Sequence, residues 1–265
     1  MKLLSLLAAT LLLLSCGTRR QLLAHSSTTI KVMSYNIHHA NPPSIDGKID
    51  LDAIAKVIKE QNPDLVALQE VDVNTTRSGK INEASLLAEK LVMNFFFAKA
   101  IDHEGGDYGV AILSKHPLTE TKIHRLSSDP ATKGEPRVMA TALVKLPGNR
   151  NIRFGSTHLD AQKSDTNRLL QVVEINAIAK AERLPFIIAG DLNATPGSPT
   201  INTFDQQFLR TCEPCEFTIP VIKPNKTIDF IAVGKPSPME VISHWVVPER
   251  YASDHLPIVS VLKFK

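Results

Sequence analysis

The sequence lacks a cluster of basic residues, and this limits the classes of partner that the protein can bind. The 265 residues contain no block of lysine and arginine, and the formal net charge is only +3. A protein dedicated to nucleic acid normally carries a basic patch for the phosphate backbone, so this class is weakly disfavoured. After residue 30 there is also no internal repeat, linker or low-complexity run. With 43% hydrophobic and 22% charged residues, the chain has the composition of an ordinary globular domain.

A long apolar run is missing at the N-terminus as well. The apolar stretch within residues 1–15 is too short to span a bilayer comfortably, and with Lys2 ahead of it the segment has the layout of a signal peptide. Ser15 precedes Cys16, which resembles the lipobox of bacterial lipoproteins, where the cysteine is lipidated after cleavage. An ordinary secretory signal followed by a chance cysteine is the alternative.

Cleavage before Cys16 would leave 250 residues (265 minus 15) and a formal net charge of +2, because Lys2 is the only charged residue removed. That length suits one large α/β domain. We therefore divide the chain into a lipoprotein-type signal peptide at 1–15, a tether at 16–29 and a domain at 30–265. This division predicts a lipid-anchored protein of the bacterial cell envelope that faces the periplasm or the exterior.

Cysteine is scarce, with three in the chain. Cys212 and Cys215 form a C-x-x-C pair, which supplies only two of the four ligands that a structural zinc site takes, and no second pair exists. In the oxidising envelope, a local disulfide is a better interpretation than redox catalysis.

The apolar pattern alternates strands with helices. Residues 30–36 and 64–70 have the pattern of strands, and between them the apolar residues at 51, 54, 55 and 58 form one face of a helix. This unit predicts two parallel strands. Further helices are expected at about 84–91, at 165–183 and from about 198, the longest burying Leu169, Val172, Val173 and Ala177. The remaining strands are expected at 94–100, 108–114, 118–124, 137–146, 153–157, 186–190, 228–233, 241–247 and 258–264.

This order of strands and helices indicates two sheets packed face to face with helices outside. Polar residues stand at the ends of several strands, which is where α/β folds build their sites. They are Asn36, Glu70, His158, Asp191 with Asn193, and Asp229, and the pair Asp254-His255 precedes the last strand. Each could have a structural role alone, but so many coincidences favour one site. If the strand at 186–190 stays extended to Asn193, Asp191 and Asn193 point to the same side.

Seven motifs resemble, in the same order, those of the endonuclease/exonuclease/phosphatase superfamily. They are Tyr35-Asn36, Leu68-Gln69-Glu70-Val71, Tyr108-Gly109-Val110-Ala111-Ile112-Leu113-Ser114, Thr157-His158-Leu159, Gly190-Asp191-Leu192-Asn193, Ile228-Asp229-Phe230-Ile231 and Ser253-Asp254-His255-Leu256-Pro257. The resemblance spans residues 30–265. It implies a four-layer αββα sandwich of two mixed sheets, and cleavage of phosphate esters with Mg²⁺ or Mn²⁺.

The resemblance also implies roles for the metal ligands. Glu70 is similar to the principal metal ligand of the family, with Asn36 beside it. Asp254 is similar to a further metal ligand or electrostatic partner. Mg²⁺ prefers few carboxylates and several waters, so Glu70 with Asp254 would serve.

The catalytic roles follow from the same resemblance. Asp191 and Asn193 resemble the pair that orients the attacking water and the phosphate, and His158 resembles a phosphate-binding histidine. Asp229 and His255 resemble a carboxylate-imidazole dyad, in which the carboxylate holds the imidazole in one tautomer. Either Asp191 or His255 could be the base. Tyr108 matches a phosphate-contacting tyrosine of one branch of the family.

Two loops bear on the substrate. Arg77 resembles a residue in a loop of bacterial and lipid-related members, where it is either a phosphate clamp or a solvated arginine. His38 and His39 either line the entrance of the pocket or are polar loop residues. No basic or aromatic insertion that could wedge into a duplex separates the motifs.

We therefore expect a divalent-metal-dependent phosphoesterase, a hydrolase whose best-fitting substrate is a small or lipid-linked phosphodiester. The alternative is an exported nuclease acting on DNA or RNA, which the modest charge disfavours. An inactive binding module would be expected to have lost Glu70, Asp191 or His255, and all three are present. The expected partners are the substrate and, through the lipid anchor, a membrane, and the protein is expected to be a monomer.

Overall fold

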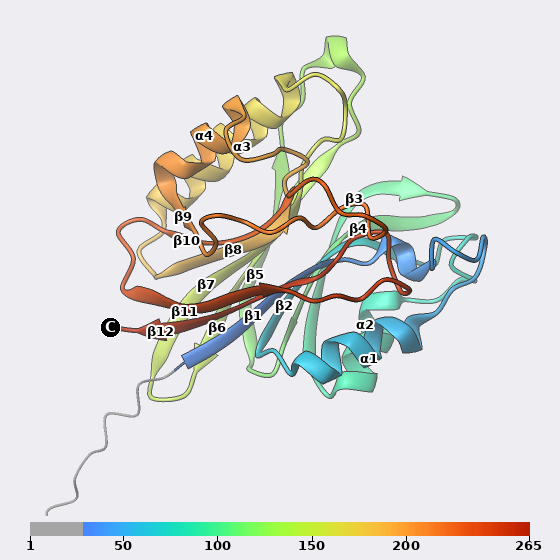
Figure 1. The fold of residues 1–265 in the computed structure, drawn as a ribbon, viewed down its shortest axis with the longest axis horizontal. Coiled ribbons are helices and arrows are strands. Elements are labelled where there is room, and N and C mark those ends of the chain that lie inside the picture. The colour runs from blue at the N-terminus through green and yellow to red at the C-terminus, as the bar shows by residue number, and fades with distance from the viewer. Residues whose placement is uncertain (1–28) are drawn as a thin grey trace, which may run out of the picture.

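The computed structural model describes residues 29–265 (Figure 1). The signal peptide predicted at 1–15, Cys16 and nearly all of the tether lie outside the described residues. Between residues 29 and 265, no helix is both long and apolar enough to cross a membrane.

Two six-stranded mixed sheets form the centre of the fold. The first sheet has the order β11-β12-β1-β2-β4-β3. Its strands are β1 (Thr29–Asn36), β2 (Leu65–Val73), β3 (Asn94–His103), β4 (Gly106–Ser114), β11 (Met239–Val246) and β12 (Ile258–Phe264). β1 and β2 pair in parallel, as predicted, and the other pairs in this sheet are antiparallel.

The second sheet has the order β5-β6-β7-β8-β10-β9. Its strands are β5 (Leu118–Leu126), β6 (Arg137–Leu146), β7 (Arg150–His158), β8 (Phe186–Asp191), β9 (Phe208–Arg210) and β10 (Asp229–Gly234). Only β7 and β8 pair in parallel. The three-residue β9 is too short to give an alternating pattern, and the sequence did not predict it.

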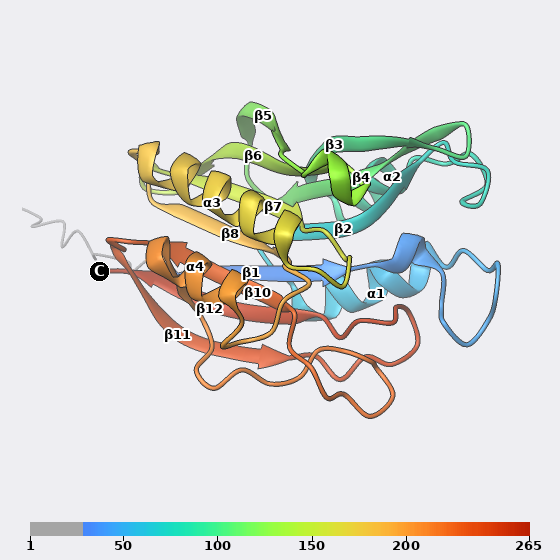
Figure 2. The ribbon, with the colours of Figure 1, turned by 90° about the horizontal axis from the view of Figure 1, so that it is seen from above.

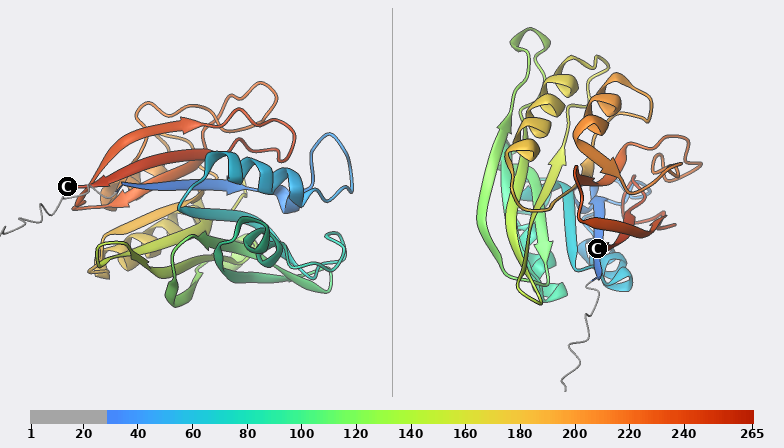
Figure 3. Two further views of the ribbon diagram at one scale, coloured as in Figure 1. Left: turned by 90° about the horizontal axis from the view of Figure 1, so that it is seen from below. Right: turned by 90° about the vertical axis from the view of Figure 1, so that its left-hand side faces the viewer.

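Helices cover the outer face of each sheet, which gives the predicted four-layer αββα sandwich (Figures 1 and 3). α1 (Leu51–Gln61) and α2 (Glu83–Leu91) pack on the first sheet, and α3 (Thr166–Ala181) and α4 (Pro199–Gln207) lie side by side over the second (Figure 2). The short 3₁₀ helices are η1 (His38–Ala40) and η2 (Pro130–Thr132).

Alternating side chains of the strands build three apolar cores. In β1, Val32 belongs to the core between the two sheets, whereas its neighbour Met33 belongs to the core under α1 and α2. In β8, Ile187 faces the other sheet and Ile188 faces α3 and α4. This period of two follows from the pleat of a strand, and strands that are buried on both faces become almost wholly apolar.

Polar caps set the ends of the helices where the sequence predicted them. The Asp50 side chain accepts a hydrogen bond from Ala53 N at the start of α1 (3.0 Å), and Ser198 does the same for Ile201 N at the start of α4 (3.3 Å). Asn62 ends α1 in the left-handed conformation, directly before Pro63. These caps fix where the chain enters α1 and α4 and where it leaves α1.

The buried face predicted for the longest helix, α3, is wrong in part. Val173 is 56% exposed and Ala177 is exposed, whereas the polar Asn167, Arg168 and Gln171 are buried beside Val172. The cause lies in the loop after His158, because Arg168 Nη1 donates to Asp160 O (2.9 Å) and Gln171 Oε1 accepts from Asp160 N (3.0 Å). Hydrogen bonds to this loop therefore decide which side of α3 faces inward.

The predicted disulfide between Cys212 and Cys215 is present in the loop between β9 and β10. Arg210 lies against it, with Nη1 3.3 Å from Cys215 Sγ. The bridge closes a tight turn, because only two residues separate the cysteines.

Candidate active site

Three neighbouring strands of the second sheet place acids and a histidine in one row. His158 is the last residue of β7 and Asp191 the last of β8, and they are direct partners in the parallel register. Asp229 is the first residue of the antiparallel β10 and is paired with Asp191. Because the register is fixed by the buried faces of these strands, the three side chains come together at one end of the sheet.

Asn36 connects this row to the first sheet. Its amide Nδ2 donates to Asp191 Oδ2 (3.2 Å) and to Glu70 Oε1 (3.1 Å). Its Oδ1 accepts from the backbone N–H of His38 (3.1 Å), and Ser253 Oγ donates to its backbone oxygen (2.7 Å). Asn36 therefore orients both carboxylates, and its amide nitrogen, not its oxygen, faces them. Metal ligation by Asn36 stays a prediction.

His255 lies between the two acids of the second sheet. Its Nδ1 is 3.0 Å from Asp229 Oδ2, and its Nε2 is 3.7 Å from Asp191 Oδ2. Burial alone would lower the pKa of His255, but the surrounding carboxylates of Asp229, Asp191 and Asp254 outweigh it and raise the pKa to about 10. The predicted carboxylate-imidazole pair is therefore present in the geometry.

Asp191 is the most perturbed acid of the site. It is buried, and burial together with the neighbouring charge of Asp229 raises its pKa to about 7, although His255 and the N–H of Asn193 oppose the rise. A carboxyl group with a pKa near neutrality can exchange a proton with water. This property fits the role that sequence comparison gives to Asp191.

His158 is buried in contact with a cation. Arg137 Nη1 donates to His158 Nδ1 (3.3 Å), and His158 Nε2 lies 3.5 Å from Asp191 Oδ2. Burial, followed by the charges of Arg137 and His255, holds the pKa of His158 well below its usual range. His158 is thus a neutral imidazole that carries its proton on Nε2, toward the row of acids.

Arg137 is a site residue that the sequence analysis missed. It is the first residue of β6, it is buried, and it hydrogen-bonds both His158 and Tyr108. The available signal was an arginine at the start of a long apolar strand, because an arginine there is rarely buried without a partner. Ser253 was quoted in a motif, but its role in holding the backbone of Asn36 and His255 was not foreseen.

Tyr108 and Arg77 lie next to each other at the edge of the site. Arg77 lies over the Tyr108 ring, 5.5 Å from its centroid. Arg77 Nε and Nη2 also form a two-point ion pair with the buried Asp72 (2.7 and 2.9 Å). Asp72 holds two of the five N–H donors of Arg77, and the Arg77 side chain is 28% exposed, so Arg77 is an anchored loop arginine with donors left over. Its contact with phosphate stays a prediction.

Asn193 and Asp254 occupy the margins of the site. The strand ends at Asp191, and Asn193 adopts a left-handed conformation with φ of 48°, so the extended geometry assumed for Asn193 is wrong. Asn193 Nδ2 donates to Leu159 O (3.0 Å), and its N–H donates to Asp191 Oδ1 (2.8 Å). Asp254 is half-buried and contributes to the raised pKa of His255.

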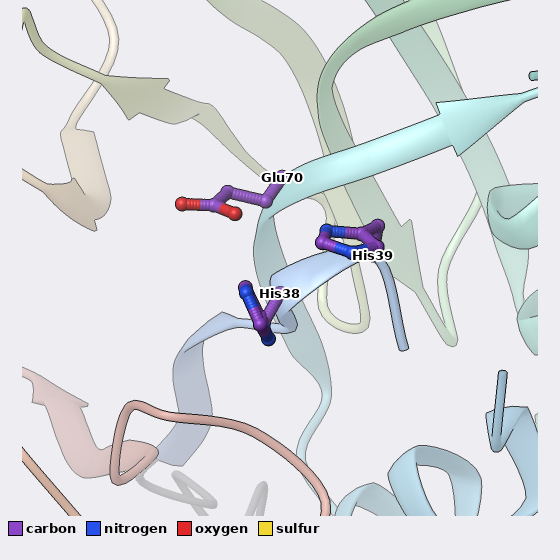
Figure 4. Close-up of side chains that lie close together, drawn as sticks. All are labelled: His38, His39 and Glu70. Carbon is purple, nitrogen blue, oxygen red and sulfur yellow. The ribbon is translucent and has the colours of Figure 1, made fainter. Parts of the chain in front are cut away.

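Glu70 projects from a bulge in β2. The pairing of β2 with β4 shifts register between Leu68 and Val71, and Glu70 has a φ of 57°. The strand was expected to end at Glu70, but it continues through the bulge to Val73. Figure 4 shows Glu70 close to His38 and His39, and the candidate ligand atoms of these three lie within 4.8 Å of one another. Asp191, Asp229 and His255 form a second such group.

The residues present fit a divalent cation. Glu70 is half-buried, and only its Oε1 is engaged by Asn36, so carboxylate oxygen remains for a ligand. Asp191 and Asp229 add two buried carboxyl groups, and His255 lies beside both of them. Hard cations such as Mg²⁺ select this kind of oxygen-rich, negatively charged pocket.

Comparison with known proteins agrees with this geometry. The sequence profile of the Endonuclease/Exonuclease/phosphatase family matches residues 33–255. The chain belongs to this family. Family members hydrolyse phosphate esters and generally depend on a divalent metal, so the protein is a phosphoester hydrolase of this type. No curated protein is similar enough in sequence to be recognised as a relative.

Solved structures share the fold. A family protein from Bacteroides thetaiotaomicron has a TM-score of 0.76 and 20% identity, covering 91% of this chain and 100% of its own. The mannosyl-6-phosphatase Bt3783 from Bacteroides thetaiotaomicron VPI-5482 has a TM-score of 0.71 and 18% identity, covering 89% and 100%. The human nocturnin catalytic domain has a TM-score of 0.70 and 21% identity, covering 89% and 94%. At these identities the likeness concerns the fold alone.

Proposed function

We propose that the protein is a divalent-metal-dependent phosphodiesterase that cleaves a P–O bond in a small or lipid-linked phosphate by attack of a water molecule. The observation that carries this proposal is the buried contact of His255 with Asp229 and Asp191, which Asn36 joins to Glu70. This group contains a proton-transfer pair and a cation ligand, linked by hydrogen bonds and by the 3.7 Å contact between His255 and Asp191.

Each part of the site suits one demand of phosphate ester cleavage. The bound divalent ion would supply positive charge that offsets the phosphate and favours deprotonation of water. Asp191, with a pKa of about 7, can take a proton from water, and it lies 3.7 Å from Nε2 of His255, whose pKa of about 10 keeps it protonated. Asp229 holds the His255 ring in place by accepting from Nδ1. Glu70 and Asp254 are the proposed metal ligands.

Donors for the phosphate oxygens come from the end of the row at His158, where β7 pairs with β6. His158 carries a proton on Nε2, and Arg137 keeps a full positive charge beside it. Burial, the largest influence, raises the pKa of Tyr108, so its phenol stays a hydroxyl donor at neutral pH. Such pre-oriented donors stabilise charge on equatorial oxygens in the transition state. Asn193 keeps an amide oxygen for water beside Asp191.

The proposed lipid anchor favours a substrate at a membrane surface. Lipidation of Cys16 would hold the enzyme at the bacterial envelope, where lipid head groups reach a high effective concentration. The formal net charge of +3 gives little attraction for a long polyanion such as DNA. We therefore favour a small or lipid-linked phosphate over nucleic acid, acted on by a monomeric enzyme.

A substrate panel tests this function. Purified protein is offered sphingomyelin, phosphoinositides, nitrophenyl phosphate mono- and diesters, and plasmid DNA, with EDTA and with Mg²⁺ or Mn²⁺. We expect diester cleavage that EDTA abolishes and the cation restores. Asp191→Asn is expected to be inactive, whereas the control Asp46→Asn, in an exposed loop, keeps full activity. Full activity in metal-free buffer would contradict the mechanism, and faster cleavage of plasmid DNA would identify a nuclease.

A further inference from the structure

Two consecutive histidines, His38 and His39, meet Glu70 beside the row of acids. Nitrogen and oxygen atoms of the three side chains lie within 4.8 Å of one another, and Figure 4 shows them grouped where the end of β1 meets the bulge of β2. None of the phosphate chemistry derived above uses either imidazole. A pair of imidazoles beside a carboxylate is a donor set of its own, so its ligand can be considered separately.

The backbone is held in an unfavourable conformation to bring the two rings together. His38, His39 and Ala40 have φ values of 47°, 42° and 54°, in the left-handed region that residues other than glycine rarely adopt. In a strand, consecutive side chains point to opposite faces. Here the turn brings the rings of His38 and His39 to a centroid distance of 4.5 Å. Local strain of this kind gathers at functional sites.

The hydrogen bonds leave a lone pair free on each side chain. His38 Nδ1 donates to Asn41 O (2.8 Å), which leaves Nε2 as the unprotonated nitrogen. Glu70 Oε1 accepts from Asn36, which leaves Oε2. His39 Nδ1 is buried and has no hydrogen-bond partner among residues 29–265. A histidine that donates one N–H to a backbone carbonyl is the usual arrangement of a metal-binding imidazole.

We propose that His38, His39 and Glu70 bind a divalent transition-metal ion of the zinc class. Imidazole nitrogen suits zinc, iron, nickel and copper, whereas Mg²⁺ selects oxygen, and two histidines with one glutamate are the protein ligands of several catalytic zinc sites. In a tetrahedral site with bonds of about 2.1 Å, the ligand atoms lie about 3.4 Å apart. A small movement of the side chains from their 4.8 Å envelope therefore completes the site.

This inference rests on the proposed function only through Glu70, and it changes the expected metal. A purely oxygen-ligated site would prefer Mg²⁺. With two imidazoles beside the carboxylate, a zinc-class ion is held against a large excess of Mg²⁺.

Cobalt(II) titration tests the site without any substrate. The full chain, carrying Cys16→Ser so that no free thiol competes, is stripped of metal and titrated with Co²⁺ while visible absorption is recorded. We expect one Co²⁺ per chain, with absorption bands that Zn²⁺ abolishes by displacement and that a hundredfold excess of Mg²⁺ leaves in place. His38→Asn and His39→Asn are expected to weaken binding about ten- to a hundredfold or more.

The variants are chosen to keep the fold. Asparagine is among the residues that tolerate the left-handed conformation, so each substitution removes an imidazole without new backbone strain. His116→Asn, in the turn between β4 and β5, is the matched control and is expected to bind Co²⁺ as the parent chain does. Circular dichroism checks that all variants are folded.

The outcomes separate this inference from the proposed function. Equal Co²⁺ affinity in the parent, His38→Asn and His39→Asn would overturn the site, as would displacement of Co²⁺ by equimolar Mg²⁺. EDTA-sensitive hydrolysis in Mg²⁺ would then still support the phosphodiesterase. Conversely, imidazole-dependent Co²⁺ binding in a protein that cleaves no phosphate ester would support the site and reject the proposed function.

Discussion

A buried acid behind the active site makes the stability of this protein depend on pH. Glu83, the first residue of α2, is fully buried, and its Oε2 accepts from Asp72 N (2.8 Å), two residues beyond Glu70. Its Oε1 has no partner among the described residues. Burial, the largest influence, raises the pKa of Glu83 to about 8 from an ordinary value of 4.5. Glu83 is therefore mostly protonated in the folded protein at neutral pH.

The sign and size of the effect follow from these two pKa values. The folded chain holds a proton that the unfolded chain has released, so Glu83 favours folding most below pH 4.5, and this contribution is lost as pH rises through 8. The two pKa values, about 8 and 4.5, differ by about 3.5, and a difference of one in pKa corresponds to about 1.36 kcal/mol. The free energy of unfolding can therefore change by at most about 5 kcal/mol between low and high pH. Relaxation of the structure and entry of water reduce the cost of a buried charge, so we expect the ionisation of Glu83 to lower the free energy of unfolding by about 2–3 kcal/mol.

Glu83→Gln tests this reasoning. Glutamine keeps an oxygen for the Asp72 N–H and cannot ionise, so the variant is expected to match the parent within about 1 kcal/mol at pH 5 and to exceed it by about 2–3 kcal/mol at pH 8. Urea unfolding between pH 5 and 8 in the presence of EDTA measures the difference. Other titrating groups are common to both proteins and cancel. Glu89→Gln, exposed on the same helix, is the control. A stability difference that does not change with pH would refute the argument.

Three further predictions concern residues already placed. His255→Ala is expected to lower kcat by roughly two to four powers of ten, and Asp229→Asn in the same direction, with the double variant little worse than the worse single one. A double loss equal to the product of the single losses would show that they do not act as a pair. Expressed in a bacterium, the chain is expected to incorporate labelled palmitate and to partition with membranes, and equal labelling of Cys16→Ser would reject lipidation. Alkylation without reductant is expected to leave Cys212 and Cys215 unmodified by mass spectrometry, and free alkylation of both would show a reduced pair.

The layers of the fold could be predicted because they depend on local pattern. The strand-helix-strand unit at the start of the domain has alternating and 3.6-residue periods, and the central strands of both sheets are buried on two faces. The face of α3 could not be predicted in this way. Arg168 and Gln171 are turned inward by hydrogen bonds to Asp160, which depend on a loop whose path no period encodes.

The row of site residues in the second sheet could be predicted for a similar reason. His158 and Asp191 end parallel neighbouring strands, so their side chains must meet once the register is set. Their contact with Asn36 needed the packing of one sheet on the other, which sequence comparison implied but periodicity did not. Arg137 escaped notice because its value to the site depends on two contacts, His158 and Tyr108, from different sheets.

Glu70, His38 and His39 show the limit of reading side-chain direction from a strand pattern. A regular strand would point Gln69 and Glu70 to opposite faces and would separate His38 from His39 in the same way. A bulge at Glu70 and a left-handed turn at the histidines break both rules, and the two irregularities face each other.

Each irregularity opposes intrinsic backbone preference, so it persists only because the surrounding structure holds it. Ser253 and Asn36 provide part of that hold, since Ser253 Oγ fixes the backbone of Asn36 and Asn36 fixes both Glu70 and the N–H of His38. Asn36 thus sets the geometry of both the acid row and the histidine pair. The binding of an ion at Glu70 would therefore depend on the arrangement of both groups.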